Sequence, residues 1–161
     1  MNVEELIERA REAILKGEKR FGEYFIYTAK IDLDEKLSWE YIKTKSYVWT
    51  SEIDQWNTTR RTIMESLGLV VIDINTTETE RGQHTIINYL SKSNIDDKYK
   101  NFLQLILGDD ITRYKINKNR IERGIPFDTA NILFSKILKR YPHESDSKIK
   151  VALERILGDI K

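Results

Sequence analysis

The sequence predicts an α+β fold in which an antiparallel sheet has the ferredoxin-like or RRM-like element order β-α-β-β-α-β, with an extra helix at each end. Two helical apolar patterns alternate with β-rich segments, and two of those segments follow one another as a hairpin. The chain has 161 residues, of which 40% are hydrophobic, which is typical of one compact domain with its own core. We therefore expect a single domain over residues 1–161, with a core at about 23–140 and terminal helices at 2–17 and 145–160.

The first half of the chain predicts a helix, a strand and a second helix. Apolar residues recur at helical spacing over residues 3–14, and Gly17 follows them as a stop signal. Residues 23–35, EYFIYTAKIDLDE, combine aromatic and β-branched side chains and predict a strand. A capping-box pattern and a closing glycine bound a helix over residues 51–68. The apolar face expected for that helix consists of Ile53, Trp56, Ile63, Met64 and Leu67.

The second half predicts the hairpin and a further helix. LVVIDIN, beginning at Leu69, and QHTIINYL, beginning at Gln83, are β-rich stretches that flank a polar tip. The helix that follows is capped by Asn94 or Asp96 and closed by Gly108. Its expected inward residues are Tyr99, Phe102, Leu103 and Ile106.

The last elements are harder to assign from the pattern. Ile111, Tyr114 and Ile116 predict the final core strand. Residues 128–142, DTANILFSKILKRYP, fit either a strand or a helix, because a short apolar run does not discriminate between the two. A helix with one apolar stripe is then expected over residues 145–160.

Composition excludes several classes of function. The absence of cysteine removes disulfides, zinc fingers, iron–sulfur clusters and thiol nucleophiles. No apolar run approaches the roughly 20 residues of a spanning helix, and the charged N-terminus lacks the apolar core of a signal peptide. We expect a cytoplasmic protein without membrane contact, in the host cytoplasm if its source is a virus. The abundance of Ile and Lys and the absence of Cys are a bias seen in thermophiles and in AT-rich genomes.

Positive charge is concentrated in one segment. The whole chain has a net charge of +1, yet eight basic and two acidic residues between Ile111 and Arg140 give that segment +6 and leave −5 elsewhere. Such asymmetry indicates contact with a polyanion. On a strand over residues 111–116, Arg113 and Lys115 share one sheet face, which suits backbone phosphates and stacked bases. The alternative is a solvated surface that keeps a lysine-rich protein soluble.

The predicted nucleic-acid contacts extend beyond that segment. Arg60 lies on the apolar stripe of a predicted helix, where an arginine must snorkel, pair with a carboxylate or reach a ligand. The hairpin tip Arg81-Gly82-x-His84 offers side-chain donors beside a glycine that permits close backbone approach, although a plain solvated loop is the simpler interpretation. The full predicted set is Arg60, Arg81, His84, Arg113, Lys115, Lys118, Arg120 and Arg123.

Acidic residues form a candidate metal site. Asp32 and Asp34 are two residues apart on a predicted strand, so both carboxylates point to one face and are able to hold a divalent cation. Asp73 and Glu78 of the hairpin are the further candidate ligands, together with Glu80 at its tip. The alternative is a polar strand end entering a turn, where aspartate is common.

The D-x-D strand and the hairpin with its Gly-x-His element resemble the catalytic palm of archaeo-eukaryotic primases. In that family two acidic residues hold metal and the histidine contacts a nucleotide phosphate, so the resemblance implies catalytic roles for Asp32, Asp34 and His84. The third acidic position of the family has no clear match, and Asp109 or Asp110 is the nearest candidate. The likeness covers two short motifs, and the overall pattern also resembles small proteins of crenarchaeal viruses and plasmids.

Three functions follow from these features. The leading hypothesis is a nucleic-acid-binding protein on an RRM-like scaffold that serves viral or plasmid replication or gene control, with DNA favoured over RNA and no cofactor. The alternative is a metal-dependent phosphoryl-transfer enzyme, a nuclease or primase-like nucleotidyltransferase, that uses Mg²⁺ or Mn²⁺. The third is a homo-oligomeric scaffold that forms a homodimer through its terminal helices. The sequence contains no Walker loop, Rossmann glycine pattern, serine-hydrolase elbow or H-E-x-x-H motif.

Overall fold

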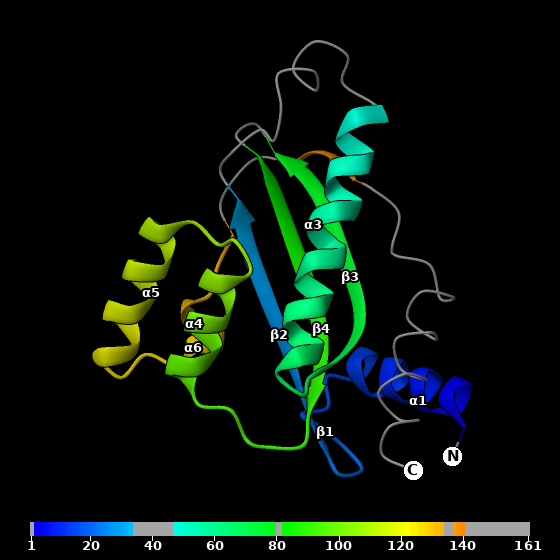
Figure 1. The fold of residues 1–161 in the computed structure, drawn as a ribbon. Coiled ribbons are helices and arrows are strands. Elements are labelled where there is room, and N and C mark those ends of the chain that lie inside the picture. The colour runs from blue at the N-terminus through cyan, green and yellow to red at the C-terminus, as the bar shows by residue number, and fades with distance from the viewer. Residues whose placement is uncertain (1, 34–46, 80–81, 134–136, 141–161) are drawn as a thin grey trace.

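The computed structural model describes residues 2–33, 47–79, 82–133 and 137–140, and it contains one antiparallel sheet with helices on both faces (Figure 1). The α+β class is therefore confirmed. The elements of the described chain are α1 (Val3–Leu15), β1 (Arg20–Phe21), β2 (Tyr24–Leu33), α3 (Tyr47–Ser66), β3 (Val70–Thr79), β4 (Gln83–Ser91), α4 (Asp97–Ile106), α5 (Ile111–Glu122), α6 (Phe127–Ala130) and β5 (Ile137–Arg140).

The sheet order is β1-β2-β4-β3-β5, and every neighbouring pair is antiparallel. The predicted strand and hairpin are present, and β4 lies between β2 and β3, as in a split β-α-β unit. The last strand differs, because β5 pairs with β3 at the edge away from β2. The full ferredoxin-like order is thus not confirmed.

Helix α1 covers one end of one sheet face. Leu6, Ile7 and Ala10 of this helix are buried against sheet residues that include Ile26 and Val70. The Asn2 side chain accepts a 2.8 Å hydrogen bond from the Glu5 N–H and caps the helix. The predicted N-terminal amphipathic helix is confirmed.

Helices α3 and α4 cover the opposite face, where Met64 and Leu103 pack against strand residues such as Ile31 and Ile87. Figure 1 shows α3 in front of β3 and β4, with α4, α5 and α6 grouped beside β2. Helix α3 begins at Tyr47, earlier than the capping pattern predicted. It ends as predicted, just before Gly68, which adopts φ +78°.

A β-bulge in β3 allows this strand to place apolar side chains in the hydrophobic clusters on both faces of the sheet. The register with β4 shifts between Val71 and Asp73, and Ile72 lies opposite no β4 residue. Val70 and Ile72 therefore face α1, whereas Val71 and Ile74 face α3. Simple alternation along the strand would not place these four residues in that way.

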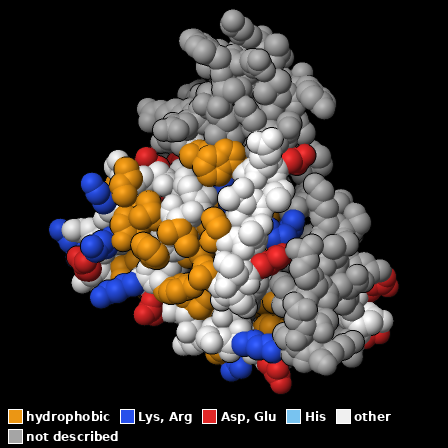
Figure 2. All heavy atoms as spheres, in the orientation of Figure 1, with side chains coloured by type: hydrophobic (Ala, Val, Ile, Leu, Met, Phe, Trp, Pro, Cys, Tyr) orange, Lys and Arg blue, Asp and Glu red, His pale blue; other side chains and the backbone are white. Residues whose placement is uncertain are grey.

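The predicted inward face of α4 is largely wrong. Leu103 is buried as expected, but Phe102 is 51% exposed and Tyr99 and Ile106 are each 40% exposed. The buried positions on this helix include Asn101 and Gln104. An apolar stripe thus remains on the outside of α4, and hydrophobic side chains gather on this side of the molecule (Figure 2).

The predicted strand at residues 111–116 is also wrong, because these residues begin helix α5. The side chain of Asp110 accepts a hydrogen bond from the Arg113 N–H and caps the helix. Ile111 and Ile116, which indicated a strand, are 50% and 46% exposed. The buried positions of α5 carry Arg113 and Asn117, so no apolar helical stripe was visible in the sequence.

The ambiguous segment 128–142 contains the end of the short helix α6 and all of strand β5. The expected helix at 145–160 lies outside the described residues. Within the part of the chain that the structure describes, no helix has both the length and the hydropathy needed to cross a bilayer.

Candidate nucleic-acid interface

Helices α4 and α5 lie side by side and run in opposite directions, joined by a short turn (Figure 1). Asp96 caps α4 by accepting a 2.8 Å hydrogen bond from the Tyr99 N–H. The turn contains Gly108, whose φ is +106°. A Cβ at this glycine would lie 3.1 Å from the ring of Trp56, so the backbone of the turn packs directly against α3. We call α4, this turn and α5 the helical hairpin.

A buried ion pair fixes α5 to the turn. The side chain of Asp109 is fully buried, that of Arg113 is 9% exposed, and their closest N–O distance is 2.9 Å. The Arg113 guanidinium also donates to the side chain of Asn131 and to the carbonyl of Ile132. Burial raises the pKa of the Asp109 carboxyl, and the charge of Arg113 opposes that rise. Arg113 was predicted to contact nucleic acid, but here its donors bind the protein itself.

The helical hairpin also occupies the outer edge of β2. The Lys30 N–H donates to the Gln104 side chain over 2.8 Å, and the Lys30 carbonyl accepts from Arg113 over 2.8 Å. The Asp32 N–H donates to the Asp109 carboxylate over 2.8 Å. Side chains of the helical hairpin therefore satisfy the backbone groups with which another strand would otherwise pair.

Arg60 is the centre of a second buried network, between α3 and the sheet, and is 1% exposed. Its Nε donates to the Leu107 carbonyl over 2.9 Å. Its Nη1 donates to the side chains of Asn57, Gln83 and Thr85, at 2.9 to 3.0 Å. Burial lowers the pKa of Arg60 to about 9, and the charge of Asp109 offsets this only in part. Arg60 is buried within the protein and offers no surface for a ligand.

Four basic residues of the predicted set remain on α5 or at its end. Lys115, Lys118 and Arg123 are exposed, and no ion pair involves them within the described residues. Arg120 is partly buried and donates to the Ala130 carbonyl over 3.1 Å. By contrast, Asp109 of the same hairpin is occupied by its pair with Arg113. α5 and its C-terminal end therefore present Lys115, Lys118 and Arg123 to solvent, together with the exposed carboxylate of Glu122.

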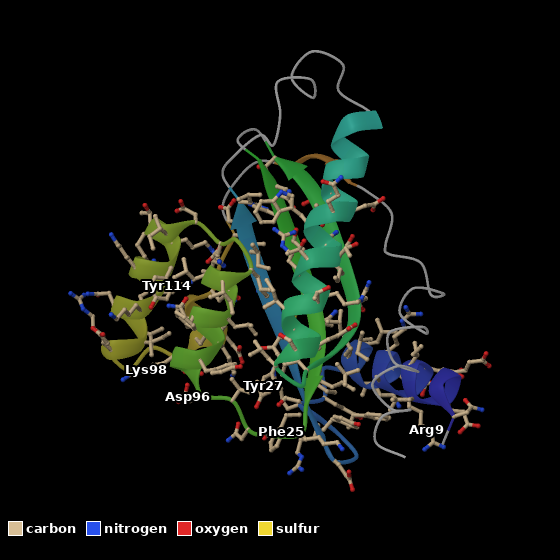
Figure 3. The ribbon with its side chains drawn as sticks, viewed as in Figure 1. Arg9, Phe25, Tyr27, Asp96, Lys98 and Tyr114 are labelled. Atoms are coloured by element: carbon tan, nitrogen blue, oxygen red, sulfur yellow. The ribbon has the colours of Figure 1, made fainter. Side chains whose placement is uncertain are left out.

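A second basic region lies in a cleft of about 570 Å³ beside the edge of β2. Phe25 and Tyr27 stack with their centroids 6.3 Å apart, and both project from the lower part of β2 (Figure 3). Arg20 lies 4.4 Å above the Phe25 ring, and Lys100 lies 4.7 Å from the Tyr27 ring centroid. Glu18 and Asp128 also line the cleft, so its charge is mixed.

The structure brings together two of the three residues implied by the primase resemblance. Asp32 and His84 are cross-strand partners on β2 and β4, with Oδ1 and Nε2 3.6 Å apart, and both are buried. Asp34 lies outside the described residues. Among those residues, no three His, Asp or Glu side chains are grouped closely enough to hold a metal ion.

The structure describes only some of the other predicted site residues on the β3–β4 hairpin. Asp73 accepts a 2.9 Å hydrogen bond from the Asn88 side chain on the same sheet face. Glu80, Arg81 and the side chain of Glu78 lie outside what the structure describes. Beside them the Thr79 N–H donates to the Gly82 carbonyl over 3.0 Å and closes the hairpin.

Sequence reasoning missed a groove between α4 and α5. It has a volume of about 250 Å³, and neither Asn101 nor Phe102, which line it, was among the predicted site residues. The signal was the apolar spacing of Tyr99, Phe102 and Ile106, which was interpreted as an inward face. No protein-family model, no curated protein and no solved structure matches the chain.

Proposed function

We propose that this chain is a nucleic-acid-binding protein on an RRM-like α+β scaffold, and that the exposed face of α5 binds backbone phosphates. One observation carries the proposal: Lys115, Lys118 and Arg123 are exposed on or next to one helix and have no ion-pair partner within the described chain. Cations without partners are free to replace the counterions of a phosphate backbone.

The expected affinity is electrostatic and moderate. Lys98 is exposed on α4 and lines the same groove as Lys118, so the described part of the helical hairpin and its C-terminal end offer four exposed cations. Four phosphate contacts predict a slope of about −3 for log K against log salt on a single strand. DNA is the expected ligand ahead of RNA, and the setting we propose is replication or gene control of a viral or plasmid genome.

The proposal is tested by fluorescence anisotropy with labelled single- and double-stranded DNA and RNA across a salt series. The double variant Lys115→Glu, Lys118→Glu should lose binding at moderate salt. The matched control is Arg9→Glu, Lys16→Glu, which makes the same charge change at exposed positions on α1 and at its C-terminal end. Equal affinities of the two double variants would reject α5 as the phosphate-binding element.

A second candidate function is metal-dependent phosphoryl transfer, as a nuclease or a primase-like nucleotidyltransferase. It is favoured by the pairing of Asp32 with His84 on adjacent strands. With Mg²⁺ or Mn²⁺ added, cleavage or extension of a labelled strand on a denaturing gel would support it. The variant Asp32→Asn should then abolish turnover and leave salt-dependent binding unchanged. Unaltered nucleic acid at every metal concentration would reject this candidate.

A homodimer through the terminal helices is the third proposal. Helix α1 already buries Leu6, Ile7 and Ala10 on the sheet, which leaves little of its apolar stripe for a second chain. Light scattering over a range of protein concentrations tests for self-association directly.

A further inference from the structure

The groove between α4 and α5 combines apolar walls, cations and a buried polar atom that has no partner in the described part of the chain. Its volume is about 250 Å³, below the roughly 300–1,000 Å³ of pockets that hold drug-sized ligands. That size suits a single small ring system. The lining residues are Lys98, Asn101, Phe102, Tyr114, Lys118, Ile121 and Glu122.

Asn101 supplies the polar atom in this groove. The residue is 2% exposed, and its Nδ2 donates to the Tyr114 carbonyl over 3.1 Å. That bond fixes the orientation of the amide, and Oδ1 has no hydrogen-bond partner among the residues that the structure describes. A buried acceptor without a donor is costly. Oδ1 is closed to solvent in this structure, so a ligand N–H gains this hydrogen bond when a flanking side chain changes rotamer.

Aromatic side chains form the walls of the groove. Phe102 is 51% exposed, and Tyr114 is partly buried on the facing helix. Figure 2 shows hydrophobic side chains collected on this side, and Figure 3 shows Tyr114 and Lys98 projecting from the helical hairpin. A half-exposed phenylalanine contributes little to the core, but its ring is available for stacking on a planar ligand.

The charged side chains that line the groove favour an anionic ligand. Lys98 and Lys118 line it from the two helices, against the single carboxylate of Glu122. A planar ring with an N–H donor that is flanked by negative charge describes a nucleobase within a nucleic-acid strand. A base inside a duplex presents neither its faces nor its Watson–Crick amino group, so the strand must be single where it binds.

We propose that this groove binds one unstacked nucleobase of a single strand, stacked on Phe102 with its exocyclic amino group donating to Asn101 Oδ1. Lys98 and Lys118 contact the flanking phosphates. This inference rests on the proposed nucleic-acid-binding function and adds strand and base preference to it. Adenine and cytosine carry such an amino group and thymine does not, so oligo-dA and oligo-dC should bind more tightly than oligo-dT.

The test measures anisotropy of oligo-dA, oligo-dC, oligo-dT and a duplex of equal length with the full chain and two variants. Phe102→Ala removes the stacking ring from a half-exposed position, so the fold should be retained, as circular dichroism checks. Ile106→Ala is the matched control, since Ile106 is 40% exposed on the same helix and does not line the groove. Phe102→Ala should weaken oligo-dA and oligo-dC binding at least about fivefold and leave the duplex unchanged.

Each outcome separates the two proposals. If the wild-type chain binds with the expected salt dependence but Phe102→Ala behaves like Ile106→Ala, the base-binding groove is rejected and phosphate binding stands. If the wild-type chain binds no nucleic acid at low salt, both proposals fail. If Phe102→Ala instead converts a dimer to a monomer in sedimentation and leaves nucleic-acid binding intact, the base-binding groove is likewise rejected and the apolar stripe of α4 is a self-association surface.

Discussion

Removal of the Arg113 side chain by Arg113→Met should destabilise the protein by about 3–5 kcal/mol, the usual cost of leaving one charge of a buried pair alone. The Asp109 carboxylate is fully buried at 2.9 Å from the guanidinium, so loss of Arg113 leaves its charge without this ion-pair partner. The carbonyls of Lys30 and Ile132 lose a donor as well. With a urea m-value of about 2 kcal/mol/M, the unfolding midpoint should fall by about 2 M.

The effect should also depend on pH. Burial already raises the pKa of the Asp109 carboxyl, and loss of Arg113 removes the charge that opposes this rise. A carboxyl whose pKa is raised on folding costs no stability below its unfolded value of about 3.9, and the cost grows as the pH rises toward the folded pKa. Urea unfolding should therefore show a smaller destabilisation by Arg113→Met at pH 4 than at pH 7.

Two controls isolate the charge. Lys115→Met, at an exposed position on the same helix, should change stability by less than about 0.5 kcal/mol. The double variant Asp109→Asn, Arg113→Gln removes both charges, and the amide oxygen introduced by its first substitution is still able to accept from the Asp32 N–H. It should be more stable than Arg113→Met at pH 7. A double variant less stable than the single one would refute the idea that an uncompensated buried carboxylate causes the loss.

Three further predictions concern the helical hairpin and α6. Gly108→Ala should lower the thermal midpoint more than Gly124→Ala, because both glycines have positive φ but only at Gly108 would a Cβ meet Trp56, at 3.1 Å; equal shifts would contradict the close packing of the turn. Asp110→Ala should cost about 1 kcal/mol in urea unfolding through loss of the α5 cap, and Asp110→Asn should restore most of it. Phe127→Ala should cost about 3–5 kcal/mol, since Phe127 is 1% exposed, and a loss below about 1 kcal/mol would place it outside the core.

The sequence was a reliable guide wherever the buried positions were apolar. The first helix and strands β2 and β4 were predicted because their core residues, such as Ala10, Ile31 and Ile87, follow the periodicity of their elements. The pattern failed in the helical hairpin, where several of the inward positions are polar. On α5 they are Arg113 and Asn117, and exposed isoleucines supplied a misleading strand pattern.

The burial of polar side chains also explains why two of the predicted site residues were misassigned. Arg60 and Arg113 were predicted to contact nucleic acid because residue type alone does not reveal whether carbonyl acceptors surround a guanidinium. Leu107 and Lys30 supply those acceptors through backbone atoms, which no side-chain pattern records. The motif resemblance suggested that Asp32 and His84 belong to one site. It could not show that they are cross-strand partners, because the register between β2 and β4 depends on tertiary structure.

The helical hairpin covers part of the outer edge of β2, so two backbone amides of that strand report whether the helical hairpin is docked. The amide hydrogens of Lys30 and Asp32 are held by Gln104 and Asp109 of the helical hairpin, so local detachment of the hairpin is the simplest route by which they exchange with solvent. A ligand that binds only the docked hairpin reduces that opening by the factor 1 + [L]/Kd. Deuterium uptake at these two amides, neither of which lines the α4–α5 groove, would then measure its occupancy without any label on the nucleic acid.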